Sequence, residues 1–295
     1  MKQSVGSQPN SDGIDYSKLT PDQWISLNSF AKDVITEFFI ETAIEDYASA
    51  RLLLQNKMFR QFYWNAAQAL EKTLKAILLL NYQKLVELND KGKQTGGLGH
   101  DLSELYSVAK NFVKEGEVQV FRPGEKLSLI LSEPKYKSAH WTEITLDEFL
   151  RRVGYFGDPN NRYGTYGFEY KPSDLFILDQ VMYCLASCVP HELMSTKVIQ
   201  EKLISNTGFD LNSFYYHNYA YQPANYKNDK LMVIYSSAQT KLRKHLGPDN
   251  PKSEEDKYLC EQWLLSHIRI NKRTLDNAKL AKHCELRVPQ ENSDA

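Results

Sequence analysis

A histidine and an aspartate stand side by side at His100 and Asp101, directly after a stretch rich in glycine and lysine. A histidine beside a carboxylate can carry a proton or contact a phosphate group. The same aspartate can instead cap the helix that Leu102 begins, while the histidine packs the loop against its surroundings. The sequence alone leaves both interpretations open.

A second charged group, Glu71, Lys72 and Lys75, interrupts a strongly helical stretch. The lysines could engage phosphate groups in a polar cleft, with the glutamate orienting them. Alternatively, Glu71 and Lys75 form an i, i+4 pair on a solvated face, which stabilises a helix by only about 0.2–0.5 kcal/mol. Both readings require one long amphipathic helix, which the apolar spacing predicts over residues 60–82.

The third group combines arginines with aromatic side chains. Arg151 and Arg152 precede Tyr155, and Arg162 precedes Tyr163. Guanidinium groups beside aromatic faces are what a single-stranded nucleic acid or a nucleotide base would use. A loop that packs its rings on a helical bundle and points its arginines at helix carbonyls would have the same sequence.

Two cysteines and a histidine, Cys184, Cys188 and His191, follow the i, i+4, i+7 spacing of one helical face and resemble a soft zinc set. Pro190 interrupts that helix and no fourth ligand is evident, so we expect buried apolar thiols rather than a metal site. We predict no metal and no cofactor.

The sequence pattern predicts that helices position all of these groups. Apolar residues recur at helical spacing, breakers separate the runs, and neither a β-hairpin signal nor a fixed repeat is present. The expected helices cover residues 26–56, 60–82, 102–112, 125–131, 146–153, 173–189, 191–205, 229–245, 253–270 and 272–284. We therefore predict an all-α protein.

Composition narrows the functional classes. The chain has 295 residues, of which 42% are hydrophobic, so it can bury a core. Its 36 basic and 37 acidic residues give a net charge of -1, which excludes a broad electrostatic footprint for nucleic acid but leaves room for a confined site. No apolar run reaches the ~18 residues of a membrane span, no signal sequence is evident, and the four cysteines suit a reducing compartment. We expect a cytoplasmic protein without membrane contact.

Several of these residues together resemble the HEPN family of helical bundles from prokaryotic toxin–antitoxin, phage-defence and RNA-processing systems. The family pattern has an acidic residue in one helix, Gln-Ala-x-Glu-Lys-x-x-Lys-Ala in the next, and a loop that ends in His-Asp-Leu. The residues of this chain that match the family pattern, in order, are Asp46, Gln68, Ala69, Glu71, Lys72, Lys75, Ala76, His100, Asp101 and Leu102. Asn161-Arg162-Tyr163-Gly164 resembles the loop before the last family helix.

The resemblance implies a HEPN-like antiparallel bundle over residues 38–190, preceded by a polar tail and leading helix (1–37) and followed by a helical C-terminal extension (191–295). Together, the resemblance and the arginine–aromatic group predict a set of ligand-binding residues, namely Asp46, Glu71, Lys72, Lys75, His100, Asp101, Arg151, Arg152, Arg162 and Tyr163. The family's ribonucleases carry an arginine that is separated from a following histidine by four to six residues, and no histidine here has one.

We therefore expect a non-catalytic binding protein that recognises RNA, another nucleic acid, a nucleotide or a partner protein in a prokaryotic defence, toxin–antitoxin or regulatory system. Expected partners include a nucleotidyltransferase and a second copy in a homodimer. One alternative is a divergent metal-independent ribonuclease that uses His100 or His140, with a lysine or Arg162 from a second subunit. The other is a purely structural dimerisation scaffold.

Overall fold

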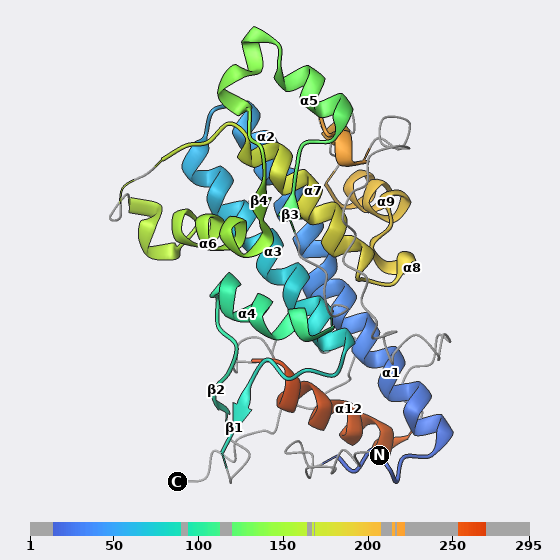
Figure 1. The fold of residues 1–295 in the computed structure, drawn as a ribbon. Helices are drawn as coiled ribbons and strands as arrows, with labels where there is room; N and C mark the ends of the chain where they lie inside the picture. Colours follow the sequence, from blue (N-terminus) through green and yellow to red (C-terminus); the bar gives the residue numbers. More distant parts are fainter. Residues whose placement is uncertain are drawn as a thin grey trace, which may run out of the picture. The chain divides into compact units, whose positions relative to one another are not determined.

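The computed structural model describes residues 14–89, 94–112, 120–163, 167, 169–207, 214–215, 217–221 and 253–269. These residues are mostly helical, which confirms the all-α prediction (Figure 1). The chain divides into two compact units. Unit 1 combines residues 1–35, 78–99 and 241–295, and unit 2 combines residues 36–77 and 100–240.

In the part of unit 1 that the structure describes, a pair of helices packs with a short ribbon of two strands. Its elements are α1 (Pro21–Ile35), the last turn of α3, β1 (Glu87–Leu88), β2 (Gln94–Gly96) and α12 (Glu254–His267). Helix α1 packs along α12, where the ring of Phe30 meets the buried Trp263 edge to face at 6.2 Å. The side-chain amide of Gln94 donates to the carbonyls of Leu265 (2.9 Å) and Ile268 (2.8 Å), which fastens the ribbon to the end of α12.

Unit 2 contains the longer bundle. Its elements are η1 (Thr36–Glu41), α2 (Thr42–Gln55), most of α3 (Phe59–Leu80), α4 (Leu102–Ala109), η2 (Lys110–Phe112), β3 (Val120–Phe121), α5 (Glu125–Leu131), η3 (Pro134–Ala139), β4 (Ile144–Thr145), α6 (Leu146–Phe156), η4 (Pro159–Tyr163), α7 (Asp174–Ser187), α8 (His191–Met194), α9 (Thr196–Thr207) and η5 (Tyr219–Tyr221).

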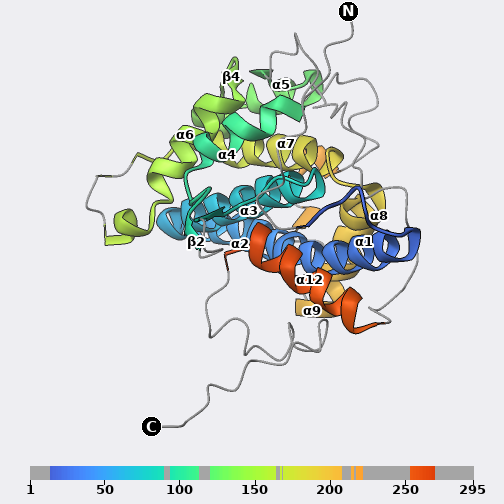
Figure 2. The ribbon, with the colours of Figure 1, turned by 90° about the horizontal axis from the view of Figure 1, so that it is seen from below.

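Helices α2, α3 and α7 form the centre of unit 2, and polar side chains join them inside the core. The Tyr47 hydroxyl of α2 donates to Asp179 of α7 at 2.7 Å, and the Tyr63 hydroxyl of α3 donates to Asp174 of α7 at 2.7 Å. Helices α4 and α6 pack against each other beside α3, and α9 packs on α2 (Figure 2). This arrangement places α3, α4 and α6 around one space.

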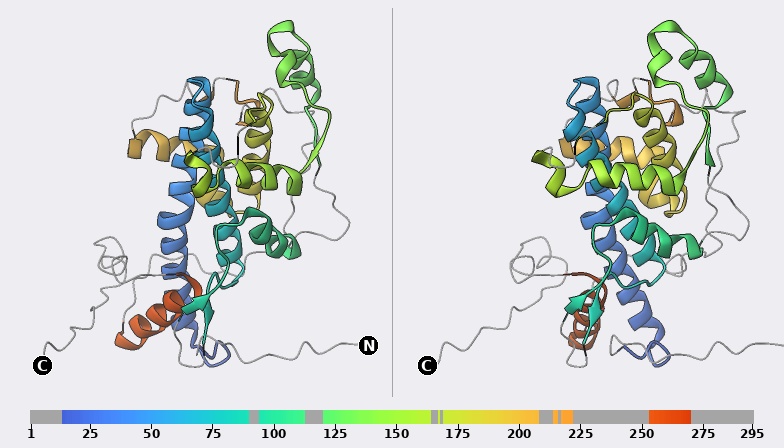
Figure 3. Two further views of the ribbon diagram at one scale, coloured as in Figure 1. Left: turned by 90° about the vertical axis from the view of Figure 1, so that its left-hand side faces the viewer. Right: turned by 60° about the vertical axis from the view of Figure 1, so that its left-hand side comes forward.

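The segment from β3 to β4 forms an arm on unit 2. Strands β3 and β4 pair antiparallel, Val120 with Thr145 and Phe121 with Ile144, and so bring the ends of the arm together. Between them, α5 and η3 extend away from α6 (Figure 3). Two apolar residues of α5, Leu127 and Leu131, pack with Ala139 and with Phe176 of α7. The arm is therefore attached to the bundle through its own small apolar cluster, to which Tyr136, Trp141 and Tyr219 also contribute.

Most helices form where the apolar spacing predicts them, but two predictions are wrong in detail. Residues 191–205 are not one helix, because α8 and α9 are separated at Ser195, whose hydroxyl accepts from Val198 N at 3.3 Å and starts α9. Two small antiparallel sheets are present, although no hairpin was expected. Their strands have only two or three residues, which is too short for an alternating pattern to appear in the sequence.

The first predicted helix, residues 26–56, is longer and less regular than expected. It begins at Pro21, after Thr20 and Gln23 exchange hydrogen bonds between backbone and side chain, and it contains the π-helical η1. The hydroxyl of Thr42 bonds the carbonyls of Phe38 (2.8 Å) and Phe39 (3.3 Å), which satisfies backbone acceptors in the widened turn. The predicted helices 229–245 and 272–284 lie outside the described residues. None of the helices in the described part combines the length and the apolar character that crossing a bilayer requires.

Candidate functional site

The charged residues of α3 form two separate ion pairs. The Lys75 ammonium lies 2.7 Å from Glu71 Oε1, and the side chains are 13% and 7% exposed, so this pair is largely withdrawn from water. Lys72 instead crosses to α2 and lies 2.5 Å from Asp46 Oδ2. Burial raises the pKa of Asp46, and the neighbouring Lys72 partly opposes this shift. The two lysines are thus engaged with carboxylates.

Glu71 also holds His100. The Nδ1 atom of the imidazole lies 2.9 Å from Glu71 Oε1 and 3.0 Å from Oε2. A carboxylate in this position fixes the ring orientation and favours a proton on Nδ1, which leaves Nε2 as the outer nitrogen. The His100 side chain is 74% exposed, so its outer edge is accessible to solvent.

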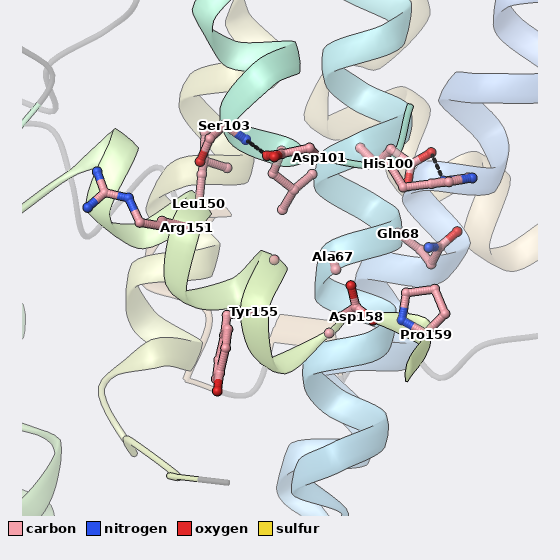
Figure 4. A pocket seen from close by; sticks show the side chains of 14 residues that line it. Ala67, Gln68, His100, Asp101, Ser103, Leu150, Arg151, Tyr155, Asp158 and Pro159 are labelled. Atoms are coloured by element: carbon pink, nitrogen blue, oxygen red, sulfur yellow. Dashed lines mark hydrogen bonds and ion pairs between the residues drawn. The ribbon is translucent and has the colours of Figure 1, made fainter. Parts of the chain in front are cut away.

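Asp101 caps α4, as one of the two sequence interpretations predicts. Its Oδ1 accepts from the backbone N–H of Ser103 at 2.8 Å and of Glu104 at 3.3 Å. The side chain is exposed and, like His100, borders the space between α3 and α4; Figure 4 shows its carboxylate bonded to the backbone of Ser103. Capping and a role in a site are therefore compatible at this residue.

A cleft of about 310 Å³ lies among α3, α4 and α6. Its walls combine apolar groups with a smaller number of polar ones, and Figure 4 shows how these side chains are distributed among the three helices. The lining residues are Ala67, Gln68, Glu71, His100, Asp101, Leu102, Ser103, Leu150, Arg151, Gly154, Tyr155, Gly157, Asp158 and Pro159. Four of the predicted site residues, Glu71, His100, Asp101 and Arg151, therefore meet in one place.

The lining is acidic. It carries three carboxylates, Glu71, Asp101 and Asp158, against the single guanidinium of Arg151. Arg151 itself forms an i, i+4 ion pair with Asp147, and Figure 4 shows its guanidinium directed away from α3. Glu71 is already paired with Lys75 and His100, so Asp101 and Asp158 are the carboxylates that make the lining acidic.

The adjacent arginines Arg151 and Arg152 do not form one patch. Arg152 forms a bidentate ion pair with Asp174 of α7. Its Nε atom lies 3.1 Å from Oδ2, and its Nη2 atom pairs with Oδ1. Asp174 is fully buried, and burial raises its pKa, while Arg152 and Tyr63 oppose that shift. Arg152 therefore stabilises the bundle. The backbone of Arg162 and Tyr163 lies in η4, and their side chains lie outside the described residues.

His140, the other histidine considered for catalysis, lies apart from the cleft. It follows η3 in the arm, where its backbone N–H donates to Lys137 O at 3.4 Å and its side chain is exposed. Cys184 is buried, and burial raises the pKa of its thiol to about 12. Cys188 is also buried at the end of α7, which agrees with apolar packing of both thiols.

Sequence reasoning missed part of the cleft, namely Ala67, Ser103, Leu150, Gly154, Gly157, Asp158 and Pro159. Only Gly154 carried a usable signal, because a glycine inside an amphipathic helix often marks a close approach or an open space. A Cβ atom at Gly154 would lie 3.8 Å from the Leu102 side chain, which is ordinary contact distance, so the position borders the cleft without being crowded.

A buried ion pair was also missed. Arg51 of α2 pairs with Asp179 of α7, and their side chains are 1% and 2% exposed. Burial is the largest influence on the carboxyl and raises its pKa, and the Arg51 charge opposes that shift. The signal in the sequence was an arginine among alanines and leucines on a helix, which by itself does not reveal the partner of the arginine.

The chain was compared with family models, with curated proteins and with solved structures. No family model, curated protein or solved structure matches it.

Proposed function

We propose that this is a non-catalytic binding protein whose cleft among α3, α4 and α6 receives a basic side chain of a partner protein. The observation that carries the proposal is the charge of the cleft: Asp101 and Asp158 place two carboxylates, and Arg151 one outward-directed guanidinium, around a partly open space of about 310 Å³. That volume lies at the lower end of the range of small-molecule sites and suits a single arginine or lysine side chain.

The walls suit the length of such a side chain. The partly exposed Pro159 offers apolar surface to an aliphatic stem, and the carboxylates of Asp101 and Asp158 are acceptors for its charged end. Tyr155 is 51% exposed at the same cleft, and its ring can contact a cation over its face. The nucleotide interpretation is less favoured, because these carboxylates repel phosphate groups.

The test is a titration of the full-length protein, labelled with nitrogen-15, with a short peptide that contains one arginine. The backbone amides of Ser103 and Gly154 should shift with the arginine peptide. A peptide with neutral citrulline in place of arginine should not shift them, and neither should AMP. If AMP shifts these amides and the arginine peptide does not, the cleft binds nucleotides and the proposal is wrong.

Asp101→Asn provides a sharper variant, because asparagine is as good an N-cap as aspartate but has no charge. Loss of one nearby carboxylate should weaken binding of the arginine peptide about fivefold, which corresponds to a loss of ~1 kcal/mol in binding free energy. The matched control is Glu104→Gln, which removes a carboxylate from the same helical turn but outside the cleft. Equal effects of both variants would indicate long-range charge rather than a specific contact.

A metal-independent ribonuclease remains the second candidate, and one observation favours it. Glu71 orients His100 through Nδ1 and leaves an exposed imidazole edge, as a general base requires. Under this proposal the protein should cleave RNA in EDTA, and His100→Ala should abolish cleavage while His140→Ala leaves it unchanged. Cleavage that survives His100→Ala, or no cleavage by the wild type, excludes this role.

The biological setting is proposed on the HEPN resemblance alone. A prokaryotic defence, toxin–antitoxin or regulatory system, with a nucleotidyltransferase as one partner or a second copy as another, would supply basic side chains to the cleft. The purely structural alternative predicts that neither the arginine peptide nor RNA affects the cleft amides.

A further inference from the structure

A short Tyr-rich segment of unit 2 closes over buried charges on α2 and α7. We call residues 214–215 and 217–221 the strap. Phe214, Asn218 and Tyr221 are almost completely buried. The rings of Phe214 and Tyr221 lie 5.7 and 5.8 Å from the ring of Tyr47, so these residues form the buried face of the strap.

This face contacts the Arg51–Asp179 ion pair and the tyrosine beside it. The Asn218 amide donates to the Tyr47 hydroxyl at 3.0 Å, and Tyr47 in turn donates to Asp179 at 2.7 Å. The guanidinium of Arg51 lies 6.0 Å from the centre of the Phe214 ring. The strap thus contributes to the burial of a charged pair, whose cost depends on how well it is enclosed.

The other side of the strap is joined to the arm through His217. Its Nε2 lies 2.9 Å from the hydroxyl of Tyr136 in η3, and its Nδ1 lies 3.0 Å from the hydroxyl of Tyr219. The backbone of His217 has φ of 55°, in the left-handed region that a residue with a Cβ rarely adopts. Such a conformation persists where surrounding contacts enforce it.

The charges that face His217 come from the arm and from α2. Lys135, whose ammonium lies 4.9 Å from the centre of the Tyr136 ring, and Arg51 are cations, whereas Glu133 is an anion. Partial burial lowers the pKa of His217, Lys135 and Arg51 lower it further, and Glu133 acts in the opposite direction. The site therefore favours the neutral imidazole.

We infer that the strap is an acid-sensitive latch, which releases from α2 and the arm when His217 takes up a proton. Release would put a charged imidazole into water, relax the left-handed backbone at residue 217 and uncover Tyr47. The latch is a property of unit 2 and does not depend on what the cleft binds.

The direction of the pH dependence follows from the pKa. In the released strap the histidine titrates near its ordinary value of 6.5, and in the docked strap its pKa is lower. The docked state is therefore fully favoured above about pH 6.5, and docking weakens as the pH falls through 6.5 toward the docked value. The equilibrium constant changes by at most about tenfold per pH unit over that range.

Hydrogen exchange of the full-length protein, expressed as protection factors between pH 7.5 and 5.5, tests the latch. Protection of the strap amides and of the amides around Tyr136 should fall several-fold below pH 6.5, while α3 amides remain unchanged. His217→Asn should remove this dependence, because asparagine tolerates the left-handed conformation and does not titrate. The control His140→Asn, which removes an exposed histidine from the same arm, should behave as the wild type.

A second variant covers the case in which His217→Asn fails to dock at any pH. Lys135→Gln removes a cation from a side chain that is 66% exposed, so the fold should be retained. The pKa of His217 should then rise toward its ordinary value, and the loss of protection at pH 5.5 should be smaller than in the wild type. Constant wild-type protection, or unchanged pH dependence in Lys135→Gln, overturns the latch.

Discussion

Asp174, at the first turn of α7, holds the side chains of Tyr63 and Arg152 inside unit 2. Its carboxylate has no exposed surface, whereas the neighbouring pair Arg151–Asp147 is 67% and 46% exposed. Two adjacent arginines on one helix therefore have opposite roles: one stabilises the core, and the other borders the cleft.

Replacement of Asp174 by alanine should reduce the free energy of unfolding by about 3 kcal/mol, because a buried guanidinium and a tyrosine hydroxyl lose their acceptor. Replacement of Asp147 by alanine removes an exposed i, i+4 partner and should cost less than about 0.5 kcal/mol. Urea denaturation of both variants measures the two values. Similar losses would show that Arg152 is not anchored through Asp174.

The contacts of a single residue could be predicted from the sequence where its partner lies nearby in the chain. Asp101 precedes the helix that it caps, and the cap prediction is confirmed. Arg152 meets a carboxylate 22 residues further along the chain, and Arg51 one on a different helix. Such pairs depend on how helices pack, which residue types and spacing do not specify. Whether the predicted binding residues bind a ligand stays a prediction.

At the scale of elements, α6 approaches α3 through a glycine at its C-terminal end. A Cβ atom at Gly157 would lie 2.5 Å from the carbonyl oxygen of Tyr63 and 2.6 Å from the Cβ of Ala67. The position therefore requires glycine because of contact with backbone, not because of its φ of -90°. Gly154, one turn earlier, faces the open cleft instead.

The two glycines provide a matched comparison. Gly157→Ala should lower the free energy of unfolding by about 1–3 kcal/mol, because backbone atoms of α3 must move. Gly154→Ala should leave stability unchanged or raise it by up to about 1 kcal/mol, because alanine favours the helix and meets no close neighbour. The urea midpoints of both variants, compared with that of the wild type, measure these changes. A Gly157→Ala variant as stable as the wild type would contradict the close approach of α6 to α3.

The helices themselves were the most predictable elements. The apolar stripe of α3 predicted residues 60–82, and the helix spans Phe59–Leu80. The π-helical turn η1 was not predictable, because an extra residue in a turn leaves the apolar character of the segment almost unchanged. The paired strands β3 and β4 were missed because their pairing depends on the arm that they close.

At the scale of the whole molecule, unit 1 is assembled from three separate stretches of chain. Trp263 of α12 is fully buried, contacts Phe30 of α1 and stacks on His267 at 4.8 Å. The end of the same helix binds the ribbon, since Leu85 N donates to His267 O at 2.8 Å. The sequence-based division at residues 37 and 190 stays a prediction.

Trp263→Ala should destabilise unit 1 by about 3–5 kcal/mol, the usual cost of a large cavity in a core. Hydrogen exchange should accelerate in residues 21–35, 85–89 and 94–96, with a smaller change in the amides of α7. Tyr258→Ala in the same helix is the control, because this side chain is 64% exposed and should have little effect. Equal acceleration throughout the chain would mean that the two units unfold together.

The bonds between Gln94 and the end of α12 span 171 residues of sequence at Leu265. A ribosome that adds about 5–20 residues per second needs roughly 10–30 s to synthesise that interval. The apolar side of α1 waits still longer for its partner, because Trp263 follows Phe30 by 233 residues. Helix α1 is therefore synthesised long before the helix that covers Phe30, and unit 1 can complete its core only after Glu254–His267 have been added to the chain.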